Sequence, residues 1–173
     1  ILRASALPAM LYNNPIAYKV DYVPGQLQEL LAEHENLHAI KESSADVRRV
    51  VALRVLVGDR LRILVGVDNM IVEAIAAGAV GWIAGLVNAF PKESVNLFQL
   101  ASEGKTQEAY ELYRRFLPLL RMDVVPKFVQ LIKLAQQEVG MGSARVRPPR
   151  LELTGPELEA ARNAVADYLK SAV

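Results

Sequence analysis

The first half of the chain alternates short apolar runs with segments of helical periodicity. The apolar runs cover residues 8–13, 37–42, 61–67 and 79–84, and each has the length and composition of a buried parallel strand. Helical patterns bounded by turn signals cover residues 24–33, 46–57 and 68–77, the last opening with Asp68, a residue type that can cap a helix. This alternation predicts right-handed crossovers and a parallel sheet.

The second half, from Pro91 onward, shows no further strand pattern. Helical patterns cover residues 92–103, 105–120, 124–139 and 155–172, and Gly104, Gly140 and Gly142 stand where helices are expected to stop. The stretch RVRPPR at residues 145–150 predicts an extended connector because its diproline disfavours helix; a phosphate-binding role is the alternative to a solvated linker. We therefore expect four parallel strands within residues 1–91 and a helical region at residues 92–173.

The composition narrows the classes of function. In 173 residues, 20 basic and 19 acidic side chains leave a formal net charge of +1, which disfavours an electrostatically driven partnership with nucleic acid or an anionic membrane. The chain has no cysteine, which excludes a disulfide framework, a thiolate metal site and a cysteine nucleophile. Its two histidines leave little for a zinc site, so we expect no metal.

Two apolar segments bear on location. Residues 1–12 lack the basic start and the small-residue cleavage site of a signal peptide, and we expect a cytoplasmic protein. Residues 74–91 are 18 consecutive uncharged residues, the lower limit for a membrane-spanning helix. Three glycines, Asn88 and Pro91 interrupt this run, which favours a helix ending near Gly78 followed by a short buried strand.

Candidate chemistry lies at the carboxyl ends of the predicted strands, where functional groups gather in parallel sheets and barrels. Lys41 shares a strand face with Leu37 and Ala39. If that face lines an apolar interior, desolvation favours the neutral amine, which can attack a ketone and form a Schiff base. The alternative is an ordinary lysine whose head reaches solvent along an apolar stem.

Tyr12 ends the preceding predicted strand and would share the inward face with Met10 and Pro8. A phenol beside a forming imine can pass protons to and from the carbinolamine oxygen. The alternative is a tyrosine that packs its ring and hydrogen-bonds its hydroxyl nearby.

Four signatures in order, at residues 12–15, 40–43, 66–68 and 78–91, make the chain resemble the dihydrodipicolinate synthase and N-acetylneuraminate lyase family. The resemblance implies a (β/α)8 barrel and a class I aldolase-type mechanism without cofactor, acting on a small-molecule substrate. Lys41 is similar to the lysine that forms the Schiff base with a 2-keto acid, and Tyr12 to the tyrosine that relays protons. Further positions match substrate-binding segments of the family: Ile83, Ala84, Gly85 and Gly66. The family is usually homotetrameric, so we expect a homo-oligomer.

Within the family, YNNPIAYKVD, AIKESSADVRRV and the segment from VVPKF to RLEL most resemble pyrroline-4-hydroxy-2-carboxylate deaminases. That resemblance implies ring opening of a cyclic imino acid with loss of ammonia, through an imine on Lys41, and so a lyase or hydrolase. The alternatives are a dihydrodipicolinate synthase and a 2-keto-3-deoxy sugar acid aldolase or dehydratase.

One family feature is missing from the chain. The family's first four strands carry a Gly-Thr-Thr-Gly-Glu segment, and no such segment occurs here. The resemblance therefore implies the second half of a barrel, strands 5–8, followed by C-terminal helices, and a requirement for an N-terminal half barrel. The alternative is a non-catalytic fragment that acts by association through its exposed edge strands.

Overall fold

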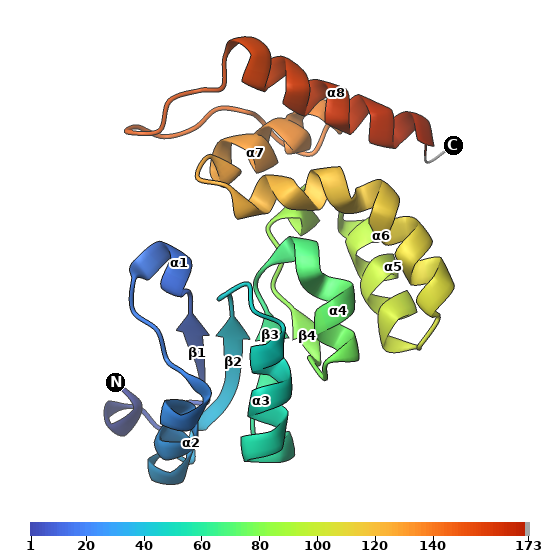
Figure 1. The fold of residues 1–173 in the computed structure, drawn as a ribbon. Helices are drawn as coiled ribbons and strands as arrows, with labels where there is room; N and C mark the ends of the chain where they lie inside the picture. The colour runs from blue at the N-terminus through green and yellow to red at the C-terminus, as the bar shows by residue number, and fades with distance from the viewer. Residues whose placement is uncertain (172–173) are drawn as a thin grey trace. The chain divides into compact units, whose positions relative to one another are not determined.

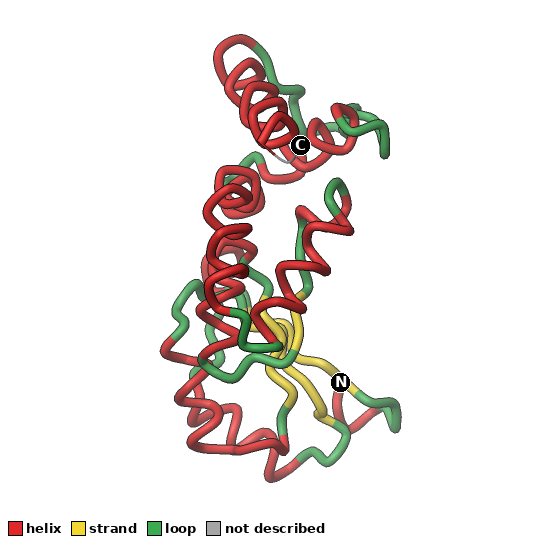
Figure 2. Tube along the Cα trace, turned by 90° about the vertical axis from the view of Figure 1, so that its right-hand side faces the viewer, coloured by secondary structure: helices red, strands yellow, loops and turns green. Residues whose placement is uncertain are grey.

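The computed structural model describes residues 1–171 and divides into two compact units, Ile1–Ile83 and Ala84–Val173. The first unit holds the whole sheet, and the second is helical. Figure 1 shows the elements in chain order, and Figure 2 shows the strands in yellow and the helices in red.

The sheet has four parallel strands in the order of the chain, as the sequence predicted. The strands are β1 (Ala9–Asn13), β2 (Leu37–Glu42), β3 (Arg62–Val65) and β4 (Gly81–Trp82). The last strand is much shorter than the predicted residues 79–84. Backbone hydrogen bonds from Val80 N to Ile63 O at 2.9 Å and from Ile83 N to Val65 O at 2.8 Å continue the pairing on either side of β4.

Helices follow the first three strands of this unit. They are α1 (Pro15–Tyr18), α2 (Pro24–Glu33), α3 (Arg48–Val57) and α4 (Ile71–Ala76), with 3₁₀ turns η1 (Leu2–Ala4), η2 (Gly58–Arg60) and η3 (Asp68–Met70). The Gln26 side chain accepts a hydrogen bond from Val23 N at the start of α2, and Asp46 accepts one from Arg48 N before α3. The expected cap at Asp68 is wrong for α4, because Met70 occupies its N-cap position.

The two faces of the sheet differ in burial. Asn13, Ile40, Glu42, Ile63 and Val65 share one face, and all are buried. On the opposite face Met10 is 47% exposed and Tyr12 is 42% exposed, while Lys41 is half-buried. The register of the parallel strands, which pairs Tyr12 with Lys41, puts these last two side chains on the same, more open face.

The second unit contains the predicted helices. They are α5 (Pro91–Ser102), α6 (Thr106–Leu120), α7 (Phe128–Glu138) and α8 (Gly155–Ser171), with 3₁₀ turns η4 (Leu86–Asn88) and η5 (Arg121–Val124). Gly104 and Gly140 adopt positive φ angles of 72° and 74° just after α5 and α7, which confirms them as stop signals. Residues 145–150 lie in the connector before α8, outside any helix.

An aromatic cluster forms part of the core of this unit. Phe90, Phe116 and Tyr168 are all buried, with ring centroids 5.1 to 5.8 Å apart. Desolvation raises the pKa of the Tyr168 phenol to about 12, and the negative charge of Glu93 adds to the shift. None of the helices within residues 1–171 combines the length and the apolar composition that a membrane span requires.

Candidate active site at the ends of the first two strands

Tyr12 and Lys41 lie side by side at the carboxyl ends of β1 and β2. They are register partners across the parallel pair, and Lys41 Nζ lies over the Tyr12 ring, 4.2 Å from its centroid. A cation at that distance from a ring face is attracted by its quadrupole. The structure therefore brings together, on the open face of the sheet, a primary amine, which can form an imine with a carbonyl, and a phenol, which can donate or accept a proton.

The Tyr12 side chain is held by the turn that follows β1. Asn14 accepts a hydrogen bond from Ala17 N at 3.1 Å as the N-cap of α1, which orients its amide. The same amide donates through Nδ2 to the Tyr12 hydroxyl at 2.9 Å. Tyr18, at the end of α1, packs edge-on against the Tyr12 ring with centroids 5.7 Å apart. The phenol thus has a fixed direction and keeps its own proton available for donation.

Gly66 leaves room for the Lys41 side chain. A Cβ atom at this position would collide with Lys41 Cε and Ser43 Oγ, and it would lie 3.0 Å from Lys41 Cγ. The absence of a side chain at Gly66 is therefore a condition for the observed course of Lys41. The predicted substrate-binding residue Gly66 lies directly beside the predicted Schiff-base lysine.

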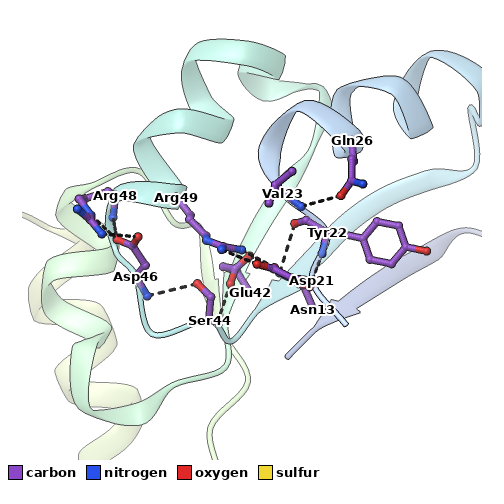
Figure 3. A network of polar contacts seen from close by, with 10 residues as sticks. All are labelled: Asn13, Asp21, Tyr22, Val23, Gln26, Glu42, Ser44, Asp46, Arg48 and Arg49. Carbon is purple, nitrogen blue, oxygen red and sulfur yellow. Dashed lines mark hydrogen bonds and ion pairs between the residues drawn. The ribbon is translucent and has the colours of Figure 1, made fainter. Parts of the chain in front are cut away.

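A buried polar network lies beneath this pair, on the other face of the same strand ends (Figure 3). Asn13 and Glu42 are register partners and are 1% and 3% exposed. Asn13 Nδ2 donates to Glu42 Oε2 and to Asp21 Oδ1, each at 3.1 Å. Glu42 Oε1 accepts from Ser44 N at 2.6 Å, so the buried carboxylate is hydrogen-bonded through both oxygens.

Arg49 connects this network to α3. Its guanidinium donates to both carboxylate oxygens of Asp21, at 2.6 and 2.7 Å. The hydrogen bonds from Arg49 hold the pKa of Asp21 below its usual range, and a further bond from Asn13 acts in the same direction. The loop after α1, the end of β1 and the start of α3 are thereby joined around one amide side chain, that of Asn13.

The other predicted substrate-binding residues lie at the end of the sheet and beyond it. Ile83 follows β4 and hydrogen-bonds β3, as described above, and Ala84 and Gly85 begin the second unit. A Cβ atom at Gly85 would collide with the carboxylate of Asp123, which lies in η5 of the same unit. Gly85 O accepts a hydrogen bond from the Asn88 side chain at 2.9 Å.

Sequence reasoning missed two parts of this site. It singled out Lys41 and Tyr12 but not Ser43, which follows Lys41 by two residues and therefore shares its strand face. Strand alternation alone could have found Ser43. The link between Asp21 and Arg49 spans 28 residues and left no local pattern to read.

Comparisons with known proteins bear on the whole chain. A sequence model of the dihydrodipicolinate synthetase family matches residues 1–171. The 4-hydroxy-tetrahydrodipicolinate synthase of Clostridium novyi is 28% identical over 165 residues, and that of Geotalea daltonii is 30% identical over 170 residues. The two alignments cover 95% and 98% of this chain but only 55% and 57% of those proteins.

The solved structures that this chain matches are also covered over little more than half of their length. The 4-hydroxy-tetrahydrodipicolinate synthase from Methylacidiphilum fumariolicum has a TM-score of 0.91 at 28% identity, over 98% of this chain and 56% of that one. A prophage protein of the dihydrodipicolinic acid synthase family from E. coli, solved in complex with pyruvate, has a TM-score of 0.86 at 25% identity, over 96% and 58%. The chain thus spans little more than half the length of these relatives.

Proposed function

The chain belongs to the dihydrodipicolinate synthetase family, and from that premise we propose that it supplies the Schiff-base lysine of an enzyme acting on a 2-keto acid. The observation that carries the proposal is the position of Lys41 Nζ, 4.2 Å from the centroid of the Tyr12 ring at the ends of two paired strands. Pyruvate in the E. coli relative supports a 2-keto acid as the substrate class.

The proposed reaction begins with attack of the neutral Lys41 amine on the keto carbon. The nitrogen loses a proton, the carbonyl oxygen gains one, and a carbinolamine forms. Tyr12 then donates its phenolic proton to the leaving hydroxyl, which departs as water, and the nitrogen lone pair forms the imine. Tyr12 recovers a proton when the imine is hydrolysed after turnover, so the cycle needs no oxidant or reductant.

Reductive trapping tests the proposal. Borohydride with pyruvate should increase the intact mass by one reduced pyruvate, and peptide mapping should place the adduct on Lys41. Lys41→Ala should abolish the adduct, whereas Lys133→Ala, at another half-buried lysine, should not. A wild-type protein without an adduct, or with one on other lysines only, would contradict the proposed function.

We propose further that the chain forms the second half of a barrel, strands 5–8. Three observations support this proposal: the open face that carries Met10 and Tyr12, the sheet edges at β1 and β4, and the alignment with little more than half of each relative. Hydrogen exchange of β1 amides should be slower when the chain is part of a complete barrel than in the 173-residue chain alone. Equal exchange in both would contradict barrel completion and favour association through the edges.

The net reaction we propose is synthesis of the 4-hydroxy-tetrahydrodipicolinate type, because the relatives from Clostridium novyi and Geotalea daltonii bear that name. Deamination of pyrroline-4-hydroxy-2-carboxylate, which the sequence favoured, is the competing reaction. The two differ in a released product. Release of ammonia from the pyrroline, with no 4-hydroxy-tetrahydrodipicolinate formed, would favour the deamination over the synthase reaction. A homotetramer in solution would fit either reaction.

A further inference from the structure

The Ser43 hydroxyl is a buried polar group that the fold does not use. Ser43 is 2% exposed, and its Oγ makes no hydrogen bond within the described residues. Buried polar side chains nearly always have a partner, and an unsatisfied one costs about 1–3 kcal/mol of stability. Such a group calls for an explanation, and a partner present only during the reaction is one.

The place of Ser43 favours that explanation. It follows β2 on the face of Lys41, and its own amide is fixed by donation to Asn13 O at 2.8 Å. Its Oγ and Lys41 Cε both lie against the same side of Gly66, where either would collide with an added Cβ. The hydroxyl and the Cε methylene that carries the proposed nucleophile therefore occupy the same space beside Gly66.

The Lys41 amine can reach this hydroxyl with a small movement. In the structure Nζ lies over the Tyr12 ring while Cε stays beside Ser43 Oγ. Rotation about the Cδ–Cε bond moves Nζ alone and leaves Cε in place. A hydroxyl offers two lone pairs and one proton, so it can accept an N–H of either the amine or the protonated imine.

We propose that Ser43 is a positioning residue whose hydroxyl accepts a hydrogen bond from Lys41 Nζ–H during imine formation and so directs the nitrogen lone pair at the keto carbon. This inference rests on the proposed function. Ser43 forms no covalent bond and keeps its own proton throughout. The hydrogen bond forms when Nζ leaves the Tyr12 ring, which explains why the hydroxyl has no hydrogen-bond partner among residues 1–171.

The test compares the trapping rate with thermal stability. Ser43→Ala should slow borohydride-dependent adduct formation about tenfold, the factor that corresponds to ~1.4 kcal/mol, and should change its pH profile. Its melting temperature should be unchanged or higher, because no native hydrogen bond is lost. Ser43→Cys replaces the hydroxyl by a thiol of similar size that is a weaker donor and acceptor, so its trapping rate should lie between those of wild type and Ser43→Ala.

Ser44→Ala is the matched control. The Ser44 hydroxyl accepts from Asp46 N at 3.3 Å, so this variant loses a local hydrogen bond and should trap at the wild-type rate. A wild-type rate in Ser43→Ala, or a slower rate accompanied by a matching loss of stability, would overturn the inference. If Ser43→Ala does not fold, an unchanged rate in Ser43→Cys would overturn it instead. The two failures are distinguishable. A wild-type protein that forms no adduct refutes the proposed function, whereas an adduct on Lys41 of wild type with no effect of Ser43→Ala refutes only the role of Ser43.

Discussion

Replacement of Gly66 by alanine adds a single methyl group at the centre of the candidate site. The methyl carbon would collide with Lys41 Cε and Ser43 Oγ and would lie 3.0 Å from Lys41 Cγ. Gly66 does not adopt a positive φ angle, so alanine can take the same backbone conformation. The substitution therefore tests steric room alone, and its whole effect should come from displacement of the neighbouring side chains.

The expected magnitude follows from which atoms can move. Ser43 has a short side chain held at 2% exposure, whereas the flexible Lys41 stem can shift, so the lysine should give way. Overpacking of this kind costs about 1–3 kcal/mol of folding free energy. A displacement of the reacting nitrogen by about 1 Å costs roughly 10²-fold in rate. Catalysis should suffer more than stability in Gly66→Ala.

Two measurements check this expectation: the rate of reductive trapping with pyruvate and the free energy of unfolding from denaturant titration. Gly25→Ala is the matched control, because a Cβ atom at Gly25 in α2 meets nothing within 4 Å. It should leave both quantities close to wild type. Wild-type trapping and wild-type stability in Gly66→Ala would refute the claim that Gly66 makes room for Lys41.

Three further substitutions probe the ends of the strands and the helical unit. Tyr12→Phe should slow adduct formation by about 10²-fold or more at unchanged fold, and an unaltered rate would remove Tyr12 from proton transfer. The lowered pKa of Asp21 contributes folding stability that is fully present above pH 3.8, the pKa of the unfolded state, and is lost as the pH falls through the folded-state pKa. Arg49→Met removes the cause of the shift, so its free energy of unfolding should fall less than that of wild type over the same acid range. The pKa of Tyr168 is raised from 10.0 to about 12, so its contribution is present below pH 10 and lost as the pH rises toward 12, by ~3 kcal/mol at most. Tyr168→Phe should reduce the alkaline loss of stability relative to wild type, and identical alkaline titrations would contradict the assignment.

The order of elements was accessible from sequence because each strand and helix has its own local pattern. β2 has the predicted bounds, since apolar residues and turn signals delimit residues 37–42 on both sides. β4 was predicted too long, because the apolar run that contains it also supplies residues that bury their side chains without strand geometry, such as Ala79. In residues 79–84 the apolar composition indicates burial of side chains, but it does not indicate which backbone groups pair in the sheet.

The environment of the candidate site was accessible only in part. Alternation placed Lys41 on one face of its strand, but the partner of that lysine depends on which residue of β1 lies opposite, and this follows from register. The bidentate bond between Arg49 and Asp21 depends on the path of the loop after α1, which no periodicity encodes. Long-range polar contacts of this kind become visible only once the elements are placed.

Register also links the buried network to the proposed chemistry. Tyr12 meets Lys41 because Asn13, the next residue, is paired with Glu42, and these two buried side chains are joined by a hydrogen bond of 3.1 Å. A slip of one residue would separate that bond, bury Asn13 or Glu42 without its partner, and turn Tyr12 or Lys41 to the other face. The polar pair on the closed face thus fixes the alignment of the amine and the phenol on the open one, although it touches neither reacting group. The positions of Tyr12 and Lys41 are therefore set by Asn13 and Glu42, the residues that follow them in the chain.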